Sequence, residues 1–138
     1  MKDVHAAAAQ GFSTEAASYA RGRPEYPPEL MPWLATTLGV SVGTRVVDLG
    51  AGTGKFTKLL TKTNAEVAAV EPVDAMRAQL AKALPNVNAL AGSAEAMPLA
   101  DAWADAVVCA QAFHWFATRA ALAEIHRVLK PGGRLGLV

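Results

Sequence analysis

Apolar residues in this chain gather in short runs separated by segments long enough to form helices. Residues 45–49, 66–70 and 105–109 are short, apolar and mostly β-branched or small, as buried strands are. Residues 87–90 predict a shorter strand, and residues 134–138 begin a fifth. The pattern therefore predicts strands with hydrophobic residues on both sides, which is typical of a parallel sheet.

Helical spacing fills the intervals between these strands. It predicts helices over residues 54–62, 73–84 and 117–129. In the last of these, the side chains expected to point inward are Leu122, Ile125 and Leu129, and Pro131-Gly132-Gly133 is expected to end the helix. Alternating strands and helices predict an α/β fold, a doubly wound Rossmann-like and mostly parallel sheet with helices on both faces.

The first 43 residues have a different pattern, without a predicted strand. Ser13 or Thr14 can cap a short helix that runs to about Arg21, and Pro27-Pro28 suits the start of another. We therefore divide the chain into an N-terminal helical segment, residues 1–43, and an α/β domain, residues 44–138.

Composition narrows the classes of protein to consider. The 138 residues suffice for one ordinary domain, and 52% of them are hydrophobic. A net charge of +1 shows no basic field, so neither a nucleic-acid nor a membrane-surface role is indicated. No apolar run approaches the roughly 20 residues that cross a bilayer. A single cysteine, Cys109, with no secretory pattern at the start, predicts a cytoplasmic protein.

Three glycines follow the first predicted strand at alternate positions: Gly50, Gly52 and Gly54. Without Cβ atoms, the main chain there can turn sharply and lie close to a ligand at a helix N-terminus. A dinucleotide-binding loop needs its third glycine where Lys55 stands. A phosphate-binding P-loop needs a glycine at Leu49 and a hydroxyl residue at Phe56. Neither loop type fits, which leaves the pattern D-x-G-x-G-x-G.

The segment Val46-Val47-Asp48-Leu49-Gly50-Ala51-Gly52-Thr53-Gly54 resembles the first motif of class I methyltransferases that use S-adenosylmethionine (SAM). Residues 92–99 and 124–133 are similar to two further motifs of that family, and the resemblance covers about residues 44–138. Residues 19–27 and 111–116 resemble signatures of its small-molecule group, which includes the ubiquinone/menaquinone and trans-aconitate methyltransferases.

The resemblance implies SAM as the cofactor and no metal. It also implies a cofactor site formed by Tyr19, Arg23, Asp48, Gly50, Ala51, Gly52, Glu71, Pro72, Met76, Ser93, Ala94, Glu95 and Gln111. In this interpretation Glu71 binds the ribose hydroxyls and Asp48 offsets the cofactor's ammonium group. Tyr19 and Arg23 close over the methionine end.

Several of these roles have a structural alternative. Ser93 replaces the family's aspartate, so the Ala94 N–H is the better expected adenine contact. Met76 either forms a wall of the adenine site or packs in the core. His114 is a candidate general base, or a side chain that packs at the rim of the cleft. The histidines and Cys109 lack the spacing of metal ligands.

The family's sheet has seven strands, whereas this sequence ends within or just after the fifth. We therefore expect a fragment of a longer protein, or a partner over the open edge, such as a second copy in a homodimer. The expected function is methyl transfer to a small-molecule acceptor. The alternatives are a SAM- or nucleoside-binding module without transfer activity and, less favoured because of Lys55, a nicotinamide-dependent oxidoreductase.

Overall fold

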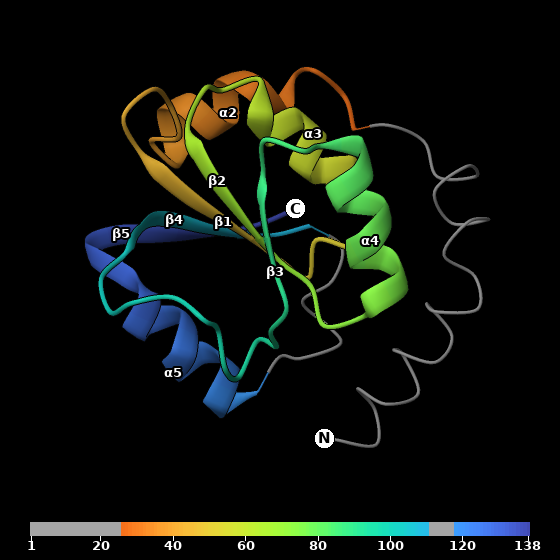
Figure 1. Ribbon diagram of the computed structural model, residues 1–138. Helices are drawn as coiled ribbons and strands as arrows, with labels where there is room; N and C mark the ends of the chain where they lie inside the picture. Colours follow the sequence, from red (N-terminus) through yellow and green to blue (C-terminus); the bar gives the residue numbers. More distant parts are fainter. Residues whose placement is uncertain (1–25, 111–117) are drawn as a thin grey trace.

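A computed structural model of the chain describes residues 26–110 and 118–138. Its five strands form one sheet in the order β3-β2-β1-β4-β5 (Figure 1). Every neighbouring pair is parallel. The strands are β1 (Arg45–Leu49), β2 (Glu66–Val70), β3 (Asn88–Leu90), β4 (Ala104–Cys109) and β5 (Leu129–Leu137). The Rossmann-like parallel sheet expected from the hydrophobic pattern is thus confirmed.

Helices cover both faces of this sheet. Figure 1 shows α2 and α3 on one side and α5 on the other. The helices of the described residues are α2 (Leu30–Thr37), α3 (Lys55–Thr61), α4 (Asp74–Ala83) and α5 (Arg119–Val128). The Thr118 hydroxyl caps α5 by accepting a 3.0 Å hydrogen bond from the Ala121 N–H.

Alternate residues of β1 enter two separate cores. Val46 packs with Leu34 and Phe56 in a cluster under α2 and α3. Val47 belongs to the opposite cluster, which includes Ile125 of α5. This period of two explains why β1 is apolar nearly throughout, because neither of its faces meets water.

Residues 26–43 share the core of the α/β domain. Leu34 and Leu38 are buried against the sheet, and Tyr26 meets the Phe56 ring edge-on with centroids 5.0 Å apart. The division at residue 43, and the prediction that residues 1–43 cover the cofactor site, stay predictions, since residues 1–25 lie outside the described part.

The end of the chain corrects two expectations. Ile125 is buried, but Leu122 is 48% exposed, because the inner face of α5 consists of Ala121, Ile125 and Val128. Leu122 lies about 100° around the helix from Ala121 and so faces outward. Leu129 is not helical, because it is the first residue of β5 and packs half-buried against the core.

Strand β5 also begins five residues earlier than the predicted Arg134. Leu129 pairs with Ala104 and Arg134 with Ala106, so Pro131-Gly132-Gly133 lies within an irregular stretch of the strand. Gly132 has φ +82°, which glycine adopts without a Cβ clash. The three residues therefore bulge from a strand that has already begun, instead of separating a helix from a strand.

The strand order reverses direction beside β1. The chain passes outward from β1 to β2 and β3, then returns to place β4 and β5 on the other side. In such sheets, ligands bind at the carboxyl ends of the strands where the order reverses. The topology therefore directs attention to the loop after Leu49 and the end of β4 at Cys109.

Candidate cofactor site

The loop after β1 uses its glycines for backbone conformations that other residues rarely adopt. Gly50, Gly52 and Gly54 have φ angles of +71°, +60° and +95°. The N–H groups of Gly50 and Ala51 both donate to the Val70 carbonyl, at 2.9 and 3.2 Å. This fixes the glycine loop to the end of β2, the neighbouring strand.

The same loop is bonded to the acid that ends β2. The Gly52 N–H donates to Oε1 of Glu71 at 2.7 Å, and the Val73 N–H donates to Oε2 at 2.9 Å. Glu71 is 4% exposed, and burial raises its pKa, although the two backbone hydrogen bonds oppose that rise. Each carboxylate oxygen still has a second lone-pair direction, so the group can accept hydroxyl donors as well.

Asp48 lies buried at the end of β1, with one of its two oxygens unbonded. Thr57 of α3 donates its hydroxyl to Oδ2 at 2.6 Å, and Oδ1 has no partner. Burial raises the Asp48 pKa to about 7; the Thr57 bond lowers it and the nearby Glu71 charge raises it. A buried carboxylate oxygen without a partner is costly, so this position suits a bound cation or donor group. The Thr53 hydroxyl in the glycine loop is buried without a partner as well.

The loop after β3 lies against the ends of β1 and β2. Ser93 and Ala96 exchange two backbone hydrogen bonds of 3.2 Å, which forms a tight turn around Ala94 and Glu95. The Ala94 side chain is buried in the cluster that contains Leu49 and Val70. The adenine-side residues predicted from the sequence therefore stand at the same end of the sheet as the glycine loop.

The remaining predicted residues are placed as follows. Pro72 is exposed, Glu95 is half-buried, and Met76 is 2% exposed on α4. Met97 packs in the core beneath α5. Four candidates lie outside the described residues: Tyr19, Arg23, Gln111 and His114.

Two contributors to this site were not predicted from the sequence. Thr57 donates a hydrogen bond to Asp48, and Arg77 donates from Nη1 to the Glu71 carbonyl at 2.9 Å. A hydroxyl residue in the first turn of the predicted helix was a usable signal for Thr57. Arg77 carries no such signal, because its role depends on how α4 is oriented against β2.

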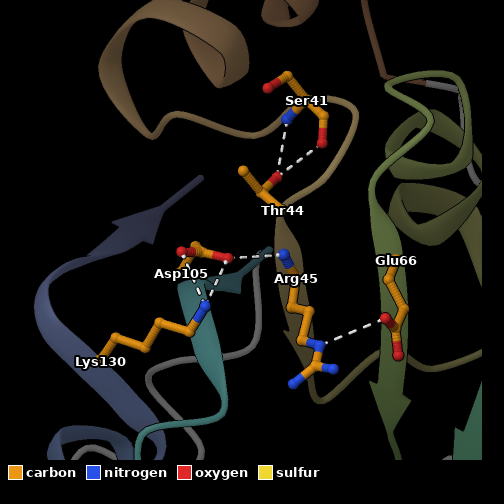
Figure 2. Close-up of polar contacts among 6 residues, drawn as sticks. All are labelled: Ser41, Thr44, Arg45, Glu66, Asp105 and Lys130. Atoms are coloured by element: carbon orange, nitrogen blue, oxygen red, sulfur yellow. Dashed lines mark hydrogen bonds and ion pairs between the residues drawn. The ribbon is translucent and has the colours of Figure 1, made fainter.

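A second group of polar residues lies at the opposite, amino-terminal end of the strands (Figure 2). Asp105 accepts the Arg45 N–H at 2.8 Å and pairs with Lys130 at 3.4 Å, while Arg45 pairs with Glu66 at 3.3 Å. A cavity of about 350 Å³ lies at this end, between the end of α2 and β5. This cavity lies at the other end of the sheet from the glycine loop. Two of its charged lining residues, Asp105 and Lys130, form an ion pair with each other.

Residues 26–110 and 118–138 contain no group of three His, Cys, Asp or Glu side chains arranged to hold a metal ion. Within the same ranges, no helix has the length and apolar character needed to cross a bilayer.

Residues 47–137 match the model of the methyltransferase domain. The chain belongs to this family. It is a class I methyltransferase domain, and the cofactor of such domains is SAM.

Individual relatives agree with this assignment. An uncharacterized methyltransferase of Mycobacterium tuberculosis is 49% identical over 127 residues, which is 92% of this chain and 51% of that protein. The ubiquinone/menaquinone biosynthesis C-methyltransferase of Rubrivivax gelatinosus is 42% identical over 95 residues, 67% of this chain and 38% of that protein. The chain spans about half the length of the first of these relatives.

The fold has solved counterparts as well. A SAM-dependent methyltransferase from Thermotoga maritima superposes with a TM-score of 0.69 at 29% identity, covering 90% of this chain and 57% of that one. The parallel sheet and its covering helices are therefore a known methyltransferase architecture.

The residues present fit SAM by their own chemistry. The glycine loop offers main chain without side chains, Glu71 retains acceptor capacity, and Asp48 Oδ1 is buried without a partner. These three features can serve an adenosyl group, its ribose hydroxyls and a cationic amine, respectively.

Proposed function

We propose that the complete protein transfers a methyl group from SAM to a small-molecule acceptor. The observation that carries this proposal is the 2.7 Å hydrogen bond from the Gly52 N–H to Glu71. It joins the glycine loop to an acidic side chain that could bind the ribose hydroxyls of the cofactor. The similarity to a quinone-pathway C-methyltransferase supports a small acceptor.

Binding and orientation are the tasks that the described residues would perform. Glu71 would accept the ribose hydroxyls, Asp48 Oδ1 would face the ammonium group, and the Ala94 N–H would meet the adenine edge. SAM supplies a methyl group already activated by a sulfonium, so the chain has chiefly to orient it and exclude water. A buried, charge-assisted network suits that task because it fixes its members in one geometry.

The other predicted contacts complete the proposal. Pro72, Met76, Ser93 and Glu95 would border the adenine. Tyr19, Arg23 and Gln111 would enclose the methionine end, with residues 1–43 as a cover. His114 is proposed as a general base only for acceptors that must lose a proton.

The alternative is a module that binds SAM or a nucleoside without transferring a group. It is favoured by one observation: the described site residues, Asp48, Glu71 and the glycine loop, all serve binding. A labelled-methyl assay on the complete gene product, with candidate small acceptors, separates the two functions. Incorporation of label supports transfer; cofactor binding without incorporation into any acceptor supports the module.

Calorimetry tests the cofactor assignment. We expect Glu71→Ala to weaken SAM binding at least tenfold, the effect of losing charge-assisted hydrogen bonds. Glu66→Ala is the matched control, because Glu66 begins the same strand at its far end and pairs with Arg45 (Figure 2). Circular dichroism checks that both variants fold. Equal SAM affinity in wild type and Glu71→Ala would overturn the assignment, and binding of NAD in place of SAM would support an oxidoreductase.

We also propose that the complete protein forms a homodimer and lies in the cytoplasm. The buried thiol of Cys109, the chain's one cysteine, supports a cytoplasmic location. A balanced net charge of +1 supports a partner other than nucleic acid. Sedimentation of the complete protein tests the dimer.

A further inference from the structure

Glu124 and Arg127 of α5 fasten the loop after β3. Oε2 of Glu124 accepts the Met97 N–H at 2.7 Å, and Nη2 of Arg127 donates to the Met97 carbonyl at 3.2 Å. One loop residue thus has both of its main-chain polar groups held by a single helix. Met97 lies 27 and 30 residues before these partners, so the contact exists only in the folded chain.

Arg127 spans more of the loop than this one residue. Its guanidinium also bonds both oxygens of Glu124, at 2.7 and 2.8 Å, and Oδ1 of Asp101 at 2.6 Å. The Arg127 carbonyl accepts the Ala102 N–H at 2.9 Å. The Arg127 hydrogen bonds lower the Glu124 pKa, since they favour the charged form of the carboxylate. Arg127 and Glu124 thus form a bidentate pair that contacts this one loop.

The start of the loop is tightly packed. A Cβ on Gly92 would lie 2.7 Å from Pro98 Cδ and 3.3 Å from a Val70 methyl, so the loop folds tightly against the end of β2. The turn at Ser93–Ala96 stands between this contact and Met97. A shift of Met97 would therefore move the Ala94 N–H, the group proposed to meet the adenine.

We propose that Glu124 and Arg127 are positioning residues for cofactor binding, which hold the Ser93–Met97 turn in the place where it contacts the adenine. This inference rests on the proposed function. It gives the Glu-x-x-Arg sequence of α5 a role that its helical surface position alone does not explain. An ordinary i,i+3 pair on a helix stabilises the helix only weakly.

The test compares SAM affinity by calorimetry in the complete protein, well below its unfolding temperature. We expect Arg127→Met to raise the SAM Kd about tenfold, since it removes hydrogen bonds to charged groups. Lys130→Met is the control: it breaks the Lys130–Asp105 pair at the other end of the sheet (Figure 2) and should leave the Kd within about twofold.

A double variant separates loop positioning from helix stabilisation. Exchanging the two residues, as Glu124→Arg with Arg127→Glu, keeps an ion pair on α5 but removes the acceptor for the Met97 N–H. We expect the unfolding temperature to recover toward wild type while the SAM Kd stays weakened. Recovery of both quantities would show that the pair only stabilises the helix and would overturn the inference.

Hydrogen exchange gives a readout that needs no ligand. The Met97 amide should exchange slowly in wild type and much faster in Glu124→Ala and Arg127→Met. The calorimetric outcomes separate the inference from the proposed function. If wild type fails to bind SAM, the proposed function fails and the inference with it. If wild type binds SAM and the Arg127 and Glu124 variants bind it equally well, the inference alone fails. If Arg127→Met does not fold, the SAM Kd is measured in Glu124→Gln instead. This variant keeps one acceptor oxygen and so perturbs the fold less.

Discussion

Thr57 donates its hydroxyl to Oδ2 of Asp48 across 2.6 Å, inside a protein interior where both side chains are essentially closed to solvent. The bond joins the end of β1 to the first turn of α3, with the glycine loop between them. It occupies one carboxylate oxygen and leaves the other, Oδ1, without a partner. Because burial raises its pKa to about 7, Asp48 should change its ionisation near neutral pH.

The Asp48 pKa predicts how stability depends on pH. Unfolded Asp48 loses its proton near 3.8, whereas folded Asp48 keeps it to about 7. Between these values the folded state binds more protons, so stability falls as pH rises. At roughly 1.4 kcal/mol per pKa unit, the wild type should lose a few kcal/mol relative to Asp48→Asn between pH 4 and 7. Urea unfolding of both proteins across this range measures the difference.

Asp105 provides a control of opposite sign. The Arg45 N–H bond lowers the pKa of this half-buried carboxyl, so its contribution should appear as pH rises through the acid range and persist above it. Wild type compared with Asp105→Asn should therefore gain stability from pH 3 to 5. A flat difference for Asp48→Asn over pH 4–7 would contradict the placement of Asp48 as a buried, readily protonated acid.

Removing the Thr57 hydroxyl should destabilise the buried carboxylate. Thr57→Val keeps the side-chain shape and loses the donor, at a cost of about 1–3 kcal/mol for a hydrogen bond to a charged group. The pH midpoint of the Asp48 effect should also move upward, since the Thr57 bond lowers the Asp48 pKa. Denaturant unfolding at pH 8 measures the cost. Thr57→Ser retains the donor and should keep the wild-type midpoint.

Gly54 is constrained both by its backbone and by its neighbours. Its φ is +95°, and a Cβ would lie 3.1 Å from Leu80 Cγ and 3.3 Å from Leu84 Cδ1, at the contact of α3 with α4. Gly43 has a similar φ of +87° with nothing within 4 Å of the added atom. Both alanine variants should lose roughly 1–2 kcal/mol to strain, and Gly54→Ala should lose more because it also disturbs packing. Equal losses of unfolding free energy in the two variants, measured by thermal unfolding, would show that packing against α4 does not constrain Gly54.

The inner face of α5 can be tested by two truncations. Ile125 is 2% exposed, so Ile125→Ala should cost about 2–5 kcal/mol. Leu122 is 48% exposed, and Leu122→Ala should cost less than about 1 kcal/mol. If Leu122→Ala lowers the free energy of unfolding by more than this in denaturant unfolding, the inward orientation predicted from helical spacing would be supported.

Much of the fold and part of the site follow from local sequence. The runs at 45–49, 66–70 and 105–109 are strands because β-branched and small apolar side chains pack well on a doubly covered sheet. Gly50, Gly52 and Gly54 adopt positive φ because they lack Cβ atoms. A glycine loop between a strand and a helix can therefore be predicted from the sequence alone. The place of Glu71 at the end of β2 is equally local.

Only the tertiary structure decided which groups meet. Thr57 reaches Asp48, Glu124 reaches Met97, and Leu122 faces outward while Leu129 enters β5, because helix orientation and strand register settle each of these outcomes. Sequence patterns report which side chains prefer burial and which backbones can turn, since these properties belong to single residues and their neighbours. Hydrogen bonds between distant segments depend on how the segments pack, and that is a property of the whole folded chain.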